Sequence, residues 1–170
     1  YLCNNNTMFG NIKLLKSGFS ETLFIDEPIN LTNKRWFEFC EITKKESFES
    51  RFKQICKEQS ISQVPLALQL SGGLDSTLIF ETLNNFQNFE TYSVVFNKGY
   101  EFDESKYIAE VLEKNNKKGK AKFLIFDDNF FKKEISNTTL SLEAPINHPH
   151  CITIKELAKL AHNNSIKVLI

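Results

Sequence analysis

The feature that most constrains the fold is a regular alternation of apolar extended runs and amphipathic helical segments over residues 46–170. The runs are short and apolar, as buried parallel strands are. Strands that alternate with helices predict an α/β fold, a doubly wound parallel sheet with right-handed crossovers and helices on both faces. The expected strands lie at 66–70, 92–96, 122–126 and 166–170, with helices before the first strand and between the others.

The spacing of apolar residues predicts which side of each helix faces the sheet. Two aspartates, Asp103 and Asp128, each precede a helical segment and are expected to cap its first turn. The expected buried faces comprise Phe48, Phe52, Ile55 and Cys56 in the first helix, Leu78, Ile79, Leu83 and Phe86 in the second, Tyr107, Ile108, Val111 and Leu112 in the third, Phe131 and Ile135 in the fourth, and Ile154, Leu157, Ala158 and Ala161 in the fifth.

Residues 1–45 follow a different pattern, in which short extended pieces are separated by turns such as Ser17-Gly18. This pattern predicts a connector or an antiparallel flap. We therefore expect a linker or flap over residues 1–45 and the α/β domain over residues 46–170.

The charge balance and the cysteines narrow the class of protein. The 170 residues carry 21 basic and 21 acidic side chains, and this zero net charge argues against a protein that coats nucleic acid or an anionic membrane. No apolar run approaches the ~20 residues that span a bilayer, and the start does not resemble a signal peptide. The four cysteines are scattered without CxxC spacing, which is typical of reduced thiols in a cytoplasmic protein.

The strongest chemical signal is LALQLSGGLDST at 66–77, where an apolar strand leads through two glycines into a helix. Gly72 and Gly73 permit positive φ and leave no Cβ between the main chain and a ligand. Successive amides can then point into one concavity that binds phosphate oxygens. The positive end of the following helix points to the same place, so the segment predicts an anion-binding turn.

Polar side chains flank the two glycines. Ser71, Ser76 and Thr77 can add hydroxyl donors to a phosphate. Asp75 would repel phosphate directly, so we expect it to hold a Mg²⁺ ion that bridges to the phosphates. The alternative is a tight strand-to-helix turn in which the glycines serve geometry and Asp75 is an ordinary N-cap residue.

The segment SGGLDS after a strand resembles the PP-loop of the ATP pyrophosphatases, which cleave ATP to AMP and pyrophosphate. Within that group, the chain resembles the synthetase domain of the glutamine-dependent asparagine synthetase family. The resemblance implies a Rossmann-like adenine nucleotide alpha hydrolase fold. It rests on further stretches that occur in the family's order: Thr7 to Gly18 with Trp36, Phe102-Asp103-Glu104 with Ala109, Glu143 with Pro145, and the strand at 167–170.

The resemblance also implies roles for individual residues. Leu70 and Val94, at or near the ends of the first two strands, would contact the adenosine through main chain and apolar surface. Asp75 would be the Mg²⁺ ligand. The β- and γ-phosphates of ATP would be bound by Ser71, Gly72, Gly73, Asp75 and Ser76. The loop around His148 and His150 departs from the family's usual pattern and borders the acceptor region.

The implied reaction is ATP-dependent conversion of aspartate to asparagine through an acyl-adenylate, with release of AMP and pyrophosphate. Glutamine would supply the ammonia through a glutaminase domain that precedes residue 1, and a second loop, SGxGxDE, would follow residue 170. A homodimer is compatible with this resemblance. Two alternatives stay open: another PP-loop adenylating enzyme, acting on a sugar acid or closing a peptide or lactam ring, and a nucleotide-binding module without chemistry.

Overall fold

The computed structural model describes residues 5–22, 32–38, 46–97, 101, 103–116 and 120–170. The chain divides into two compact units, Tyr1–Lys45 and Glu46–Ile170. In the first unit, strand β1 (Phe19–Thr22) pairs antiparallel with β2 (Thr32–Arg35). Gly18, at φ 78°, accepts hydrogen bonds from the main-chain N–H groups of Trp36 (2.9 Å) and Phe37 (3.3 Å). That this unit is a linker from a glutaminase domain stays a prediction.

The second unit is built on a parallel sheet of four strands, and this confirms the predicted α/β class. The strand order is β5-β4-β3-β6, and each neighbouring pair runs parallel. The strands are β3 (Leu66–Gln69), β4 (Glu90–Phe96), β5 (Ala121–Phe126) and β6 (Val168–Leu169), close to the expected positions. The main-chain N–H of Leu70 donates to the Tyr92 carbonyl at 2.9 Å. This bond continues the β3–β4 pairing to the residue just before the SGGLDS turn.

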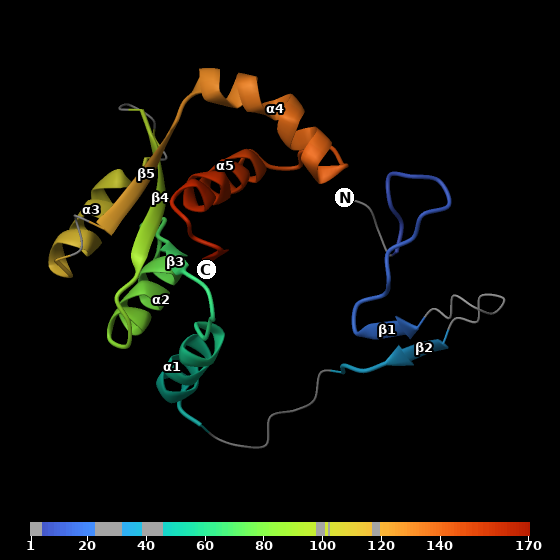
Figure 1. Ribbon diagram of the computed structural model, residues 1–170, viewed down its shortest axis with the longest axis horizontal. Coiled ribbons are helices and arrows are strands. Elements are labelled where there is room, and N and C mark those ends of the chain that lie inside the picture. Colours follow the sequence, from blue (N-terminus) through green and yellow to red (C-terminus); the bar gives the residue numbers. More distant parts are fainter. Residues whose placement is uncertain (1–4, 23–31, 39–45, 98–100, 102, 117–119) are drawn as a thin grey trace. The chain divides into compact units, whose positions relative to one another are not determined.

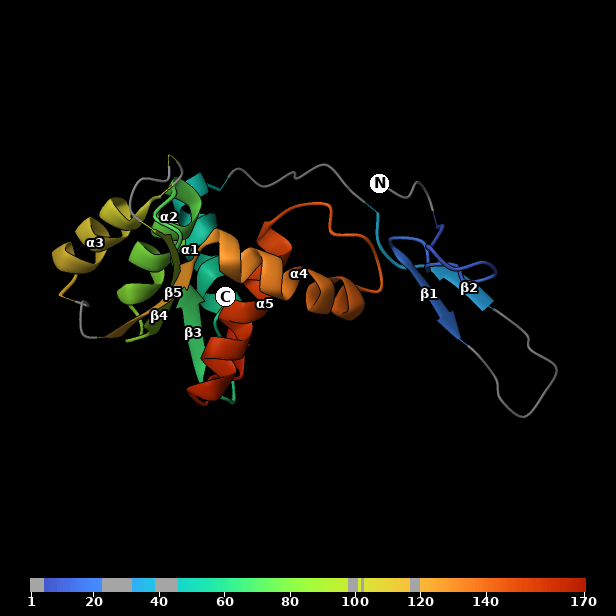
Figure 2. The same ribbon diagram turned by 90° about the horizontal axis from the view of Figure 1, so that it is seen from above.

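Helices cover both faces of this sheet (Figures 1 and 2). One face carries α2 and α3 with α1 beside α2, and the other carries α5, against which α4 packs. Successive side chains of β3 and β4 point to opposite faces of the sheet, so apolar residues of both strands contribute to the core on each face. The helices are α1 (Phe48–Gln59), α2 (Leu74–Asn84), α3 (Ser105–Lys114), α4 (Asp128–Leu142) and α5 (His150–Asn163).

The two cores divide the buried apolar residues by sheet face. Leu68 of β3 and Leu70, just after that strand, pack with α1, α2 and α3, whereas Ala67 and Tyr92 pack with α5. The first core comprises Cys56, Leu68, Leu70, Phe80, Leu83, Phe89, Ile108 and Leu112. The second comprises Ala67, Tyr92, Leu157 and Ala161.

Several expected helix faces are wrong in part, because only some of their apolar residues reach the sheet. In α4 the prediction fails most clearly: Glu134 and Thr138 are the buried residues, and Ile135 is exposed. The reason is that α4 packs against α5, so the face that it buries is set by that helix. The other residues expected in the core but exposed are Phe48, Ile55, Leu78, Phe86, Tyr107, Ile154 and Ala158.

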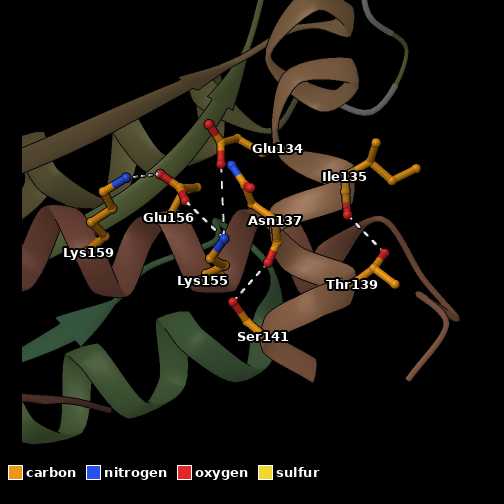
Figure 3. Close-up of polar contacts among 8 residues, drawn as sticks. All are labelled: Glu134, Ile135, Asn137, Thr139, Ser141, Lys155, Glu156 and Lys159. Atoms are coloured by element: carbon orange, nitrogen blue, oxygen red, sulfur yellow. Dashed lines mark hydrogen bonds and ion pairs between the residues drawn. The ribbon is translucent and has the colours of Figure 1, made fainter. Parts of the chain in front are cut away.

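Charged side chains of α4 and α5 form a network of ion pairs where the two helices pack together (Figure 3). Lys155 Nζ lies 4.0 Å from Oε2 of Glu134 and 3.8 Å from Oε1 of Glu156. Lys159 Nζ lies 3.4 Å from the other carboxylate oxygen of Glu156. Both carboxylates are more than nine-tenths buried, so a cation between them offsets the cost of removing two like charges from water. This network links α4 to the helix that carries His150.

None of the described helices has both the length and the apolar content that a membrane span requires.

Candidate nucleotide-binding site

The turn between β3 and α2 depends on one glycine in particular. Gly72 has φ 86°, a conformation that L side chains rarely adopt. A Cβ at this position would lie 3.1 Å from Cγ1 of Ile108 and 3.2 Å from the carbonyl oxygen of Glu104. Gly72 therefore lets the main chain turn tightly while it touches the start of α3. Gly73, whose φ is −71°, does not use the positive φ that glycine permits.

The hydroxyl groups of this turn bond to one another. The Ser71 N–H donates to Ser76 Oγ at 3.1 Å, and the two serine oxygens lie 2.9 Å apart. Gly73 N–H donates to Ser71 Oγ at 3.3 Å, and Ser76 Oγ donates to the Gly73 carbonyl at the same distance. These bonds fold the turn back on the first turn of α2. Thr77 Oγ1, by contrast, is buried and has no hydrogen-bond partner among the described residues.

No side chain caps the start of α2. Gly73 holds the N-cap position, and its lack of a side chain leaves the first-turn N–H groups without a capping acceptor. In α1 and α4 the same place is filled by side chains, since Ser47 accepts from Ser50 N–H and Asp127 from Phe130 N–H. A phosphate at the start of α2 would supply the missing acceptor.

Asp75 lies in the first turn of α2, two residues after the N-cap, so the alternative that makes it an N-cap residue is wrong. Its carboxylate is exposed and makes no hydrogen bond or ion pair within the described ranges. A carboxylate oxygen of this kind fits Mg²⁺, which takes one or two carboxylates together with phosphate oxygens. Among the described residues no group of three His, Cys, Asp or Glu side chains could hold a metal ion.

The turn between β4 and α3 is arranged differently. Glu104 occupies the N-cap position, and Asp103 lies one residue earlier than a capping residue, which corrects the sequence-based prediction. The Asp103 carboxylate nevertheless accepts from the N–H of Ser105 (3.3 Å), the hydroxyl of Ser105 (2.6 Å) and the N–H of Phe96 (3.2 Å). The hydroxyl bond is the main reason why the pKa of Asp103 lies below its usual value; partial burial opposes the shift, and the Phe96 and Ser105 amides add to it.

A cleft of about 110 Å³ opens at the carboxyl ends of β3 and β4. Ligands of open α/β sheets bind at this end of the strands. The cleft contains Leu70, Ser71 and Val94, for which the family resemblance implied contacts with adenosine or phosphate. The remaining lining residues are Gln69, Phe96, Glu104, His150, Thr153 and Ile154.

The structure thus brings the predicted residues together in two adjoining groups. Three of them line the cleft, and Gly72, Gly73, Asp75 and Ser76 follow in the turn directly after it. The side chain of Leu70 is fully buried in the core, which leaves its main chain to face a ligand. Their roles in binding a nucleotide stay predictions.

Sequence reasoning missed the wall that α5 provides. Thr153 and Ile154 line the cleft, although the helical spacing placed Ile154 against the sheet. The sequence offered one signal for this wall, the unusual histidines in the segment that precedes and begins α5. A contact between residues some eighty positions apart cannot be read from local spacing.

Comparison with known families agrees with this geometry. The family model described as asparagine synthase matches residues 47–170, which cover the whole parallel sheet and all five described helices, including Ser47, the N-cap of the first. The chain belongs to the asparagine synthase family. No curated protein sequence matches it.

Asparagine synthase family membership accounts for the fold and the coarse chemistry together. The four-stranded parallel sheet with helices on both faces is compatible with the family's Rossmann-like PP-loop fold. The family carries out ATP-dependent amidation of the asparagine synthetase kind, so the chain is assigned to a class of ATP-using ligases. The open turn at the start of α2 lies within the matched residues.

Proposed function

We propose that this chain forms the ATP-binding part of a ligase that converts aspartate to asparagine through an acyl-adenylate. The observation that carries the proposal is the uncapped start of α2 beside the cleft at the carboxyl ends of β3 and β4. Adenosine would lie along Leu70 and Val94. The β- and γ-phosphates would lie in the turn from Ser71 to Ser76, where they would accept from its N–H and hydroxyl groups.

In the proposed reaction, a carboxylate oxygen of aspartate forms a bond to the α-phosphorus of ATP. The bond between that phosphorus and the bridging oxygen breaks, and its electron pair leaves with pyrophosphate. Ammonia released from glutamine by a glutaminase domain then attacks the acyl carbon, loses a proton and expels AMP. The turn stabilises the charge that grows on the departing pyrophosphate. Mg²⁺ held by Asp75 would neutralise part of the same charge.

The decisive experiment replaces Asp75 by alanine in the whole protein. We expect Asp75→Ala to abolish Mg²⁺-dependent pyrophosphate release from ATP in the presence of aspartate, because the ion loses its protein ligand. Asp128→Ala is the matched control, since Asp128 is also an exposed carboxylate in the first turn of a helix, α4, where Asp127 is the cap. Wild-type release by Asp75→Ala would contradict the assignment.

Identifying the product tests which carboxylate the enzyme amidates. Incubation of the whole protein with aspartate, glutamine and MgATP should yield asparagine, AMP and pyrophosphate in equal amounts. Release of pyrophosphate that depends on a different carboxylate would keep the adenylation step and replace aspartate. Binding of MgATP without pyrophosphate release across a panel of carboxylates would instead favour a nucleotide-binding module.

A further inference from the structure

We propose that His150 contacts the α-phosphate of the bound nucleotide and stabilises the charge there while the acceptor carboxylate attacks. This inference rests on the proposed function, and it assigns a residue from α5 to a site otherwise built from the turns after β3 and β4. His150 is exposed and lines the same cleft as Leu70, Ser71 and Val94.

The order of the proposed contacts, from adenosine to the terminal phosphates, places the α-phosphate in this cleft. In the proposed function, Leu70 and Val94 of this cleft contact the adenosine, and the turn that begins at Ser71 binds the β- and γ-phosphates. The α-phosphate joins these two parts, so it must pass the start of the turn. The cleft, at about 110 Å³, is well below the roughly 300 Å³ of pockets that enclose whole drug-sized ligands, so only part of the nucleotide enters it.

The side chains around the cleft leave one basic group to meet a phosphate. Among the described residues that line it, Glu104 and His150 are the ones with ionisable side chains, and neither lysine nor arginine is present. The Glu104 carboxylate would repel a phosphate. The imidazole of His150 can donate an N–H to a phosphate oxygen, and the charge of the phosphate strengthens that bond.

The main chain of His150 is held on both sides. Its N–H donates to Nδ1 of His148 at 3.2 Å, and the two rings meet edge to face with centroids 4.5 Å apart. Its carbonyl accepts from Oγ1 of Thr153 at 3.0 Å, and Thr153 is 5% exposed. The ion pairs of Lys155 with Glu134 and Glu156 tie the same helix to α4 (Figure 3). His150 is therefore presented from a positioned helix turn, as a group that acts on a reacting atom needs to be.

The test compares two ligands that differ only in the α-phosphate. AMP and adenosine are titrated calorimetrically into the whole protein and into His150→Ala. We expect the variant to bind AMP about 10-fold more weakly, the loss of one charge-assisted hydrogen bond, and to bind adenosine with unchanged affinity. His150→Gln keeps an N–H donor and should recover part of the AMP affinity. His162→Ala, an exposed histidine in the last turn of α5, should bind both ligands as the wild type does.

Equal losses for AMP and adenosine, or no loss for AMP, would overturn the assignment of His150. A wild-type protein that binds AMP no more tightly than adenosine would also overturn it. The Asp75→Ala result separates the two proposals: if that variant loses pyrophosphate release while His150→Ala binds AMP normally, the function stands and His150 alone is wrongly assigned. If Asp75→Ala releases pyrophosphate normally, the role of Asp75 is wrongly assigned; if the wild-type protein releases no pyrophosphate from MgATP with any carboxylate, the proposed function itself fails.

Discussion

The turns after β3 and β4 lead from neighbouring parallel strands into helices on the same face of the sheet, but they complete the helix start in opposite ways. After β4, the Asp103 carboxylate accepts from a strand N–H and from the first residue of α3. After β3, the helix start has a glycine at the N-cap and no capping side chain. The turn after β5 differs from both. There the N-cap residue itself, Asp127, accepts from the Phe130 N–H at 2.7 Å and caps α4 directly.

The comparison shows that the three turns differ in whether a side chain accepts from the helix start. A buried or capped N–H group is already satisfied, whereas an uncapped helix start needs an external acceptor. Gly72 favours the open turn, because its positive φ and its close contact with α3 would strain any other residue. The turns after β4 and β5 supply a side-chain acceptor to the helix that follows, whereas the turn after β3 supplies none.

The largest expected effect comes from Gly72→Ala. The new Cβ would meet Ile108 and the Glu104 carbonyl within 3.2 Å at a residue of φ 86°, so we expect a loss of about 2–4 kcal/mol in the free energy of unfolding. Urea denaturation followed by circular dichroism measures it. Gly73→Ala is the matched control, because φ is −71° and the nearest atom to its Cβ is 3.4 Å away; its cost should stay below about 1 kcal/mol. Equal costs would show that the open turn does not depend on Gly72.

An intermediate effect is expected when the closed turn after β5 loses its cap. Asp127→Ala removes the acceptor of the Phe130 N–H, and the free energy of unfolding should fall by about 1–2 kcal/mol. The same denaturation assay reports the change. Asp128→Ala removes a neighbouring exposed carboxylate that is not the cap, and it should cost only about 0.3 kcal/mol through the helix dipole. If both variants lose the same amount, the direct cap contributes nothing beyond its charge.

The smallest effect is expected at the turn after β4. Asp103→Ala should lower the free energy of unfolding by about 1 kcal/mol, since the carboxylate accepts from Phe96 and Ser105. Glu104→Ala is the control, because the Glu104 side chain makes no capping hydrogen bond.

The Asp103 effect should also depend on pH. The pKa of Asp103 is lowered in the folded protein, first by the Ser105 hydroxyl, so ionisation favours folding. Its stabilisation is fully present above the unfolded pKa, near 3.9, and is lost as the pH falls through the lower folded value. The difference between wild type and Asp103→Ala should therefore hold at pH 7 and shrink below about pH 4. A difference that grows on acidification would contradict this.

How much of the site the sequence could predict depends on how far apart along the chain its residues lie. The strand that ends at Leu70, the turn and the helix that follows are consecutive, so their order predicted an anion-binding turn with Asp75 nearby. The same local reasoning placed Asp103 and Asp128 as caps, whereas the structure gives those N-cap positions to Glu104 and Asp127. Errors of one residue arise because a cap depends on main-chain angles, which residue type constrains only weakly.

The sequence by itself determined the α/β class, the positions of the four parallel strands and the turn between the Leu66 strand and its helix, because each follows from the spacing of neighbouring residues. The tertiary structure alone decided which face of α4 is buried and that His150 meets Leu70 and Val94 in one cleft. The physical reason is that burial and clefts depend on which elements pack together, and that packing joins residues whose separation along the chain carries no periodic signal.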